Sequence, residues 1–139
     1  MSFRTRYYFD FCQDIKNQIF NETNSEDEQQ ILKRVFYSRL YYTVLLYLRD
    51  RFNLHSRPGL HTAIEREIPR SDVICEQANI LQKFITLKER RIQADYEIEN
   101  LLSNNNDTSN NMRLYLTFVE DLLDGKFDHT PNLAYPLPL

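Results

Sequence analysis

The chain has 139 residues, enough for one domain with a single hydrophobic core, and 42% of them are apolar. Only two glycines and five prolines are present, so the closely spaced turns that a β-sheet needs are missing over most of the chain. The formal net charge of −3 argues against a general nucleic-acid coat protein.

The first predicted element is a helix over residues 3–20, because apolar side chains recur along it every three or four residues. Residues 21–27 are polar and interrupt it, and Ser25 with Glu28 has the pattern of a capping box. The next helix, over residues 26–52, carries an apolar residue at every fourth position: Leu32, Phe36, Leu40, Val44, Leu48 and Phe52. We expect this helix to form the centre of a bundle.

A loop is predicted over residues 53–59, because Pro58 and Gly59 are typical turn residues. A short helix over residues 60–68 should follow and end at Pro69.

A third long helix is expected from residue 71, with Ser71 as its N-cap, to about residue 102. After a polar loop, a last helix should cover residues 112–124 and end at Gly125.

Four or five such helices with short connections predict an all-α fold, an antiparallel four- to five-helix bundle. We expect one domain over residues 1–125 and an extended tail over residues 126–139. The first residues do not resemble a signal peptide, and no apolar run reaches the roughly 18 residues of a membrane span, so we expect a cytoplasmic protein.

The two cysteines, Cys12 and Cys75, match no metal-binding spacing, and we expect two buried thiols rather than a disulfide. The three histidines also lack the spacing of a zinc site, so no metal or cofactor is predicted.

Positive charge is concentrated in residues 33–70, which carry eight Lys or Arg against three Asp or Glu. The segments on either side of it are acidic. The basic segment can attract phosphate, or its arginines can pair with the acidic flanks, and the sequence leaves both interpretations open.

Arg49, Asp50 and His55 lie at the end of the long second helix, inside the basic segment. An Arg binds phosphate through two hydrogen bonds, and a His transfers protons near neutral pH. Together they suit metal-free RNA cleavage. Six helical steps rotate by about 240°, so Arg49 and His55 converge only if the helix ends near Phe52 and Asn53. Composition alone produces about one such Arg–His pair by chance, so the spacing is weak evidence by itself.

The chain resembles the HEPN superfamily over about residues 30–125. The resemblance rests on two segments and the loop between them: Ser38-Arg39-Leu40-Tyr41-Tyr42, the loop with His55 and His61, and Arg91-Ile92-Gln93-Ala94-Asp95-Tyr96. It implies a helical bundle that commonly forms a homodimer. Active members carry an Arg, a polar residue and, a few residues later, a His, which Arg49, Asp50 and His55 match.

This resemblance implies a ribonuclease that acts in phage defence or in a toxin–antitoxin pair. Its alternative is a non-catalytic module that binds a nucleotide, a nucleotidyltransferase-like antitoxin or an effector protein. In the first case His55 is the general acid or base, Arg49 binds the scissile phosphate and Asp50 orients one of them. Further contacts to RNA or phosphate are expected from four residues: Arg39, Arg51, Arg57 and His61.

Simpler interpretations remain beside these. His55 and His61 compete for the catalytic role, and either can be a capping or surface residue. Arg91 and Asp95 are spaced for an ordinary ion pair along one helix, and Tyr96 is expected in the core. The whole chain can also be a structural helical adaptor.

Overall fold

The computed structural model describes residues 3–21, 24–55, 59–70, 80–96, 108–128 and 137. Every regular element in these segments is helical: α1 (Phe3–Ile19), α2 (Glu26–Arg51), α3 (Leu60–Glu67), the 3₁₀ helix η1 (Ile68–Arg70), α4 (Ile80–Tyr96) and α5 (Ser109–Leu123). The all-α class is therefore confirmed. None of the described helices is both long enough and apolar enough to cross a membrane.

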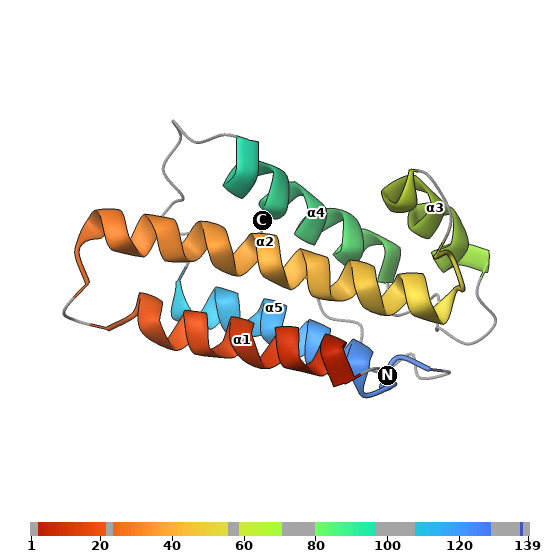
Figure 1. Ribbon diagram of the computed structural model, residues 1–139, viewed down its shortest axis with the longest axis horizontal. Helices are drawn as coiled ribbons and strands as arrows, with labels where there is room; N and C mark the ends of the chain where they lie inside the picture. Colours follow the sequence, from red (N-terminus) through yellow and green to blue (C-terminus); the bar gives the residue numbers. More distant parts are fainter. Residues whose placement is uncertain are drawn as a thin grey trace.

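Helix α2 runs through the middle of the molecule (Figure 1). Helices α1 and α5 lie along one side of it, and α4 lies along the other side (Figure 1). Both α1 and α4 run in the direction opposite to α2, while the short α3 sits near the C-terminal end of α2. That end of the bundle therefore gathers the last turns of α2 and α5, the first turn of α1 and helix α3.

The start of α2 follows the predicted capping pattern. Ser25 is the N-cap, and its hydroxyl oxygen accepts a hydrogen bond from the backbone N–H of Glu28 at 3.2 Å. The Ser25 hydroxyl in turn donates to the Glu28 carboxylate at 3.2 Å. Three acidic residues in the first turn also face the positive end of the helix dipole. The predicted start of this helix is confirmed.

The start of α5 was predicted too late. The helix begins at Ser109 instead of residue 112, because the Thr108 side chain caps it by accepting from the backbone N–H of Asn111 at 3.2 Å. An Asn-rich segment has a low helix propensity, and this cap overrides it. The predicted end is confirmed, since Gly125 has a φ of 73° and follows the C-cap.

Two further predictions differ from the structure. Pro69 does not end α3 but lies within η1, after α3 has ended at Glu67. Tyr96 is 68% exposed rather than part of the core. The helix predicted over residues 71–102 is present as α4 over Ile80–Tyr96, and both of its predicted ends lie outside the described residues. Ser71, Cys75 and Arg57 lie outside the described residues.

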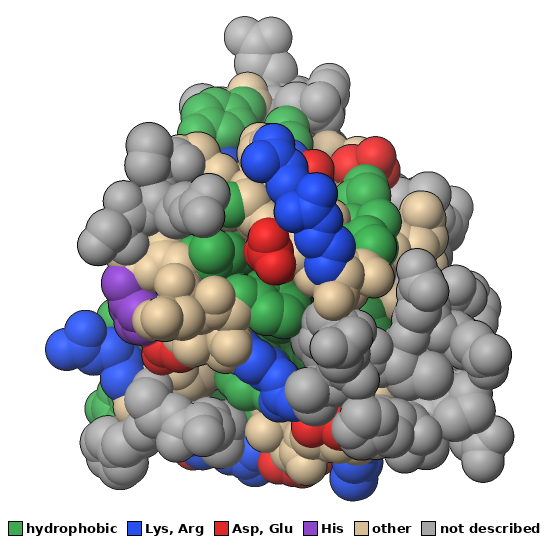
Figure 2. Space-filling view, turned by 90° about the vertical axis from the view of Figure 1, so that its right-hand side faces the viewer, with side chains coloured by type: hydrophobic (Ala, Val, Ile, Leu, Met, Phe, Trp, Pro, Cys, Tyr) green, Lys and Arg blue, Asp and Glu red, His purple; other side chains and the backbone are tan. Residues whose placement is uncertain are grey.

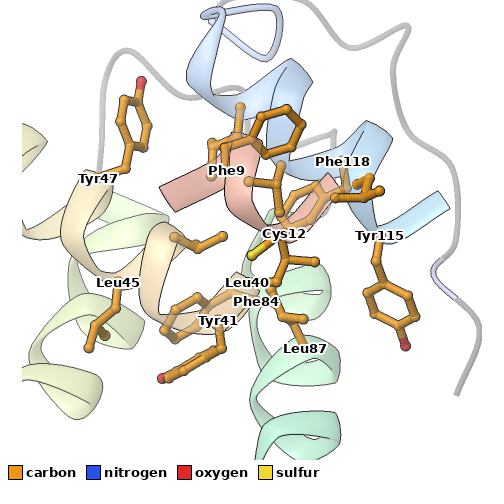
Figure 3. Close-up of a cluster of buried hydrophobic side chains, with 14 of the residues drawn as sticks. Phe9, Cys12, Leu40, Tyr41, Leu45, Tyr47, Phe84, Leu87, Tyr115 and Phe118 are labelled. Atoms are coloured by element: carbon orange, nitrogen blue, oxygen red, sulfur yellow. The ribbon is translucent and has the colours of Figure 1, made fainter. Parts of the chain in front are cut away.

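The core lies between α1, α2, α4 and α5 and combines aliphatic side chains with aromatic rings (Figure 3). The rings are among its largest fully buried side chains, which include Phe9, Phe36, Tyr37, Phe84, Tyr115 and Phe118. Cys12 is a buried free thiol, and burial raises its pKa to about 12. Phe127 is fully buried and lies 5.8 Å from Phe118 between ring centroids, so the core extends past residue 125.

Candidate functional site

The end of α2 turns the chain back on itself. Asn53 has a φ of 56°, a left-handed conformation that Asn adopts more readily than most residues. The backbone N–H of Leu54 donates to the carbonyl of Arg49 at 2.9 Å, and that of Asn53 donates to Asp50 at 3.3 Å. The Leu54 side chain is buried, which fixes the turn. His55 follows immediately and returns toward the last turn of the helix.

Arg49, Asp50 and His55 meet as a result, and we call them the helix-end cluster. The Oδ1 atom of Asp50 accepts hydrogen bonds from Nη2 and Nε of Arg49 at 3.2 and 3.3 Å. The Nε2 atom of His55 lies 3.4 Å from the same oxygen. Arg49 and His55 therefore converge, because α2 ends near Phe52 and Asn53, which was the condition derived from helix geometry.

The helix-end cluster is open to solvent. The His55 side chain is 52% exposed, and the side chains of Arg49 and Asp50 are about one-third exposed. Asp50 beside Nε2 favours the tautomer with its proton on that nitrogen, which leaves the lone pair of Nδ1 free to accept a proton. Arg49 uses two of its N–H groups on Asp50, and a guanidinium has five in all. The cluster can therefore offer a base and several phosphate donors at one place.

Arg51 is engaged elsewhere. It donates to the hydroxyl of Tyr47 at 2.6 Å and to the carboxylate of Asp128 at 2.9 Å. Arg39 lies ten residues before Arg49 on α2, about 15 Å away along the helix axis, and stacks over the ring of Tyr42 at 5.6 Å. Neither of these two predicted phosphate contacts joins the helix-end cluster.

A groove of about 510 Å³ begins at Asp50. Its walls come from the first turn of α1 and the last turns of α2 and α5: Thr5, Tyr47, Asp50, Arg51, Leu123, Asp124 and Gly125. Tyr47, Asp50 and Arg51 are three and four residues apart on one helix face, so their spacing could have predicted one wall. No local pattern connects them with Asp124, which is why sequence reasoning missed the groove.

His61 belongs to a different arrangement, which we call the Tyr41–His61 cluster and which also includes Glu65, Lys88 and Arg91. The Tyr41 hydroxyl and Nδ1 of His61 are 2.5 Å apart, and the two rings are parallel. Burial raises the pKa of Tyr41, so the hydroxyl keeps its proton, and it donates a hydrogen bond to Nδ1 of His61 when that nitrogen carries no proton. Burial, followed by the charges of Arg91 and Lys88, lowers the pKa of His61, while Glu65 opposes this effect.

The Tyr41–His61 cluster connects three helices. Lys88 of α4 and Glu65 of α3 are 2.9 Å apart. Arg91 pairs with Asp95 at 3.0 Å, which confirms the ion pair predicted from their spacing. Asp95 also accepts from the Ser38 hydroxyl at 3.4 Å. The two helical segments with the HEPN resemblance therefore lie side by side.

On the face that Figure 2 shows, blue Lys and Arg side chains form a short row with red and green side chains beside it. Several arginines of the basic segment are already engaged by acceptor groups. Arg51 pairs with Asp128, and Arg49 pairs with Asp50 inside the same segment. Arg34 donates to the backbone carbonyls of Gln93 and Ala94. Pairing with an acidic flank is therefore observed for Arg51, whereas Arg49 contacts a carboxylate of the basic segment and Arg34 contacts two backbone carbonyls. Within the described segments, no group of three or more His, Cys, Asp or Glu is arranged to hold a metal ion.

Comparison with known proteins identifies no relative: no family model, no curated protein and no solved structure matches the chain.

Proposed function

We propose that this chain is a metal-independent endoribonuclease of the HEPN type that acts in phage defence or beside an antitoxin. The observation that carries the proposal is the convergence of Arg49 and His55 on Oδ1 of Asp50. These groups are solvent-accessible, so an RNA strand can reach them. The sequence resemblance to HEPN ribonucleases supports the same assignment.

In the proposed reaction His55 removes the proton from a ribose 2′-hydroxyl, and the resulting oxygen attacks the adjacent phosphorus. The bond from phosphorus to the 5′-oxygen breaks, and a protonated imidazole supplies the proton that this oxygen takes up. Arg49 stabilises the extra negative charge on the phosphate, and Asp50 holds Arg49 and the His55 tautomer in position. The products are a 2′,3′-cyclic phosphate and a 5′-hydroxyl.

A homodimer forms part of the proposal, because HEPN ribonucleases place the motifs of two subunits in one cleft. A second copy would supply a second His55, so that one imidazole acts as the base and the other as the acid. Arg57 is proposed as an auxiliary phosphate contact. Arg51 can take the same role only by leaving Asp128, which holds it at 2.9 Å.

A second candidate function is a non-catalytic module that binds a nucleotide, a nucleotidyltransferase-like protein or another effector. The observation that favours it is the exposure of aromatic side chains on α1, where Tyr7 is 66% and Phe11 is 42% exposed. This candidate predicts thermal stabilisation by a nucleotide or by a co-purified partner.

Cleavage of single-stranded RNA in EDTA tests the first proposal. Wild-type protein should cut and leave a cyclic phosphate end. His55→Ala should cut about 10²- to 10⁴-fold more slowly, the usual contribution of a general acid or base. His61→Ala, assayed where circular dichroism shows it folded, is the matched control and should retain cleavage. A folded wild-type protein without activity, or an equally active His55→Ala variant, contradicts the proposal.

A further inference from the structure

The groove that begins at Asp50 differs in character from the phosphate-binding groups beside it. Two carboxylates, those of Asp50 and Asp124, belong to its walls. Its arginine, Arg51, is already paired with Asp128. The carboxylate of Asp124 accepts a hydrogen bond from Arg6 at 3.4 Å, and that of Asp50 accepts one from Arg49. The groove and its immediate ion-pair partners are thus close to neutral overall, and two carboxylates and one guanidinium belong to its walls.

The helix dipoles add to this pattern. The last turn of α2 and the last turn of α5 both end at the groove, and the C-terminal end of a helix carries partial negative charge. The opposing contribution comes from the first turn of α1, represented by Thr5. Inside the groove, the C-terminal ends of two helices and the carboxylates of Asp50 and Asp124 disfavour the binding of a phosphate. A neutral ligand with hydrogen-bond donors is favoured at the same place.

The size and walls of the groove suit a flat ring. Its volume of about 510 Å³ falls within the usual range of small-ligand sites. Tyr47 and Leu123 contribute apolar surface, and both side chains are mostly buried, so they form a firm wall.

We propose that the groove binds a guanine base of single-stranded RNA, next to the phosphate that the helix-end cluster cleaves, with Asp124 as the residue that selects it. This inference rests on the proposed function, because the groove and the cluster share Asp50. The shared carboxylate places the proposed base site beside the groups that would hold the scissile phosphate. The structure therefore assigns the phosphate to Arg49 and the base to the groove.

Guanine is the base whose pairing edge matches a carboxylate. Its N1–H and N2 amino group are adjacent donors, so the two oxygens of Asp124 can accept both. Adenine and cytosine offer one amino group beside an acceptor nitrogen, and uracil offers one N–H between two carbonyl oxygens. A carboxylate facing an acceptor loses hydrogen bonds and is repelled, so these bases bind less well.

Four RNA oligonucleotides that differ at one position test the inference, with G, A, C or U in an otherwise constant single strand. Wild-type protein should cleave the strand with G about 10-fold faster than the others. Asp124→Asn should lose this preference, because an amide presents a donor where guanine also presents donors. Asp10→Asn is the matched control: Asp10 lies 3.8 Å from the same Arg6 but does not contribute to the groove. It should retain the preference.

Binding of guanosine, which has no phosphate, separates this inference from the proposed function. In titrations followed by NMR, guanosine should shift signals of groove residues in wild type and in Asp10→Asn, but not in Asp124→Asn, and adenosine should have a much smaller effect. If guanosine binds but RNA is not cleaved, the guanine site in the groove is supported and the proposed ribonuclease activity is overturned. Cleavage with equal rates for all four bases, or a preference that survives in Asp124→Asn, overturns the groove assignment alone. Thermal melting confirms that both variants are folded.

Discussion

The helix-end cluster and the Tyr41–His61 cluster contain the same kinds of side chain in opposite surroundings. In the first, His55 is 52% exposed, and its neighbours come from the same helix end. In the second, His61 lies against a Tyr41 side chain that is only 2% exposed, and its neighbours come from three helices. A histidine can transfer protons only if a nitrogen is free to reach the substrate. The structure thus separates a histidine that is available for chemistry from one that holds helices together.

The two clusters are nevertheless connected along the chain. Helix α3 begins five residues after His55. The contacts that attach it to the bundle include the hydrogen bond between His61 and Tyr41, the ion pair between Glu65 and Lys88, and the buried side chain of Ile64. The Tyr41–His61 cluster therefore fixes one end of the segment that carries His55.

The largest expected difference between the two histidines is in stability. His61→Ala removes a partly buried ring and leaves the Tyr41 hydroxyl without its acceptor, which should lower the free energy of unfolding by about 1–3 kcal/mol. His55→Ala changes an exposed side chain and should lower it by less than about 0.5 kcal/mol. Urea denaturation of both variants measures the two values. Equal losses would remove the distinction between the clusters.

The Tyr41 hydroxyl should account for part of that loss. Tyr41→Phe keeps the ring in the core but leaves Nδ1 of His61 without its donor, at a cost of about 1 kcal/mol. Tyr42→Phe is the matched control, since Tyr42 is 37% exposed, lies next in sequence and makes ring contacts with Tyr8 and Arg39. The Tyr42 hydroxyl can bind water in the folded chain as well as in the unfolded chain. Its removal should therefore change the unfolding free energy by only a few tenths of a kcal/mol. A loss of similar size in both variants would show that the hydrogen bond to His61 is not the cause.

The fold was predictable from local patterns because each pattern acts within one helix. Examples in α2 are the apolar residue at every fourth position and the capping pair at Ser25 and Glu28. The predicted start and end of α2 agree with the structure to within one residue. The start of α5 was missed because a single cap at Thr108 outweighed the poor helix propensity of the three residues after it. A prediction from low helix propensity is thus wrong where a single capping hydrogen bond determines the first residue of the helix.

The candidate site was predictable to the same extent, and for the same reason. Arg49 and His55 converge through a turn that involves only neighbouring residues. The condition for this convergence, an end of α2 near Phe52 and Asn53, could therefore be derived from the sequence. The partners of His61 and Arg51 were not predictable, because Tyr41 lies 20 residues and Asp128 lies 77 residues away along the chain. Such contacts depend on how helices pack, and no periodicity within one helix specifies them.

The smallest expected effect is a dependence of stability on pH that belongs to His61. Because folding lowers the pKa of His61 below its ordinary value of 6.5, the unfolded chain binds a proton more readily than the folded one. The stability due to neutral His61 is therefore complete above that value and is lost as the pH falls through it toward the folded pKa. The slope cannot exceed about 1.4 kcal/mol per pH unit for one proton, and solvent screening of a partly exposed ring keeps it well below this limit.

Carboxylates in ion pairs also lose stability in acid, so the contribution of His61 appears as a difference between variants. Urea denaturation at about pH 7.5 and about pH 5.5 should show a smaller loss for His61→Gln than for wild type, because the variant has no imidazole to protonate beside Lys88 and Arg91. If His61→Gln loses as much stability between the two pH values as wild type does, the proton of His61 is not linked to folding.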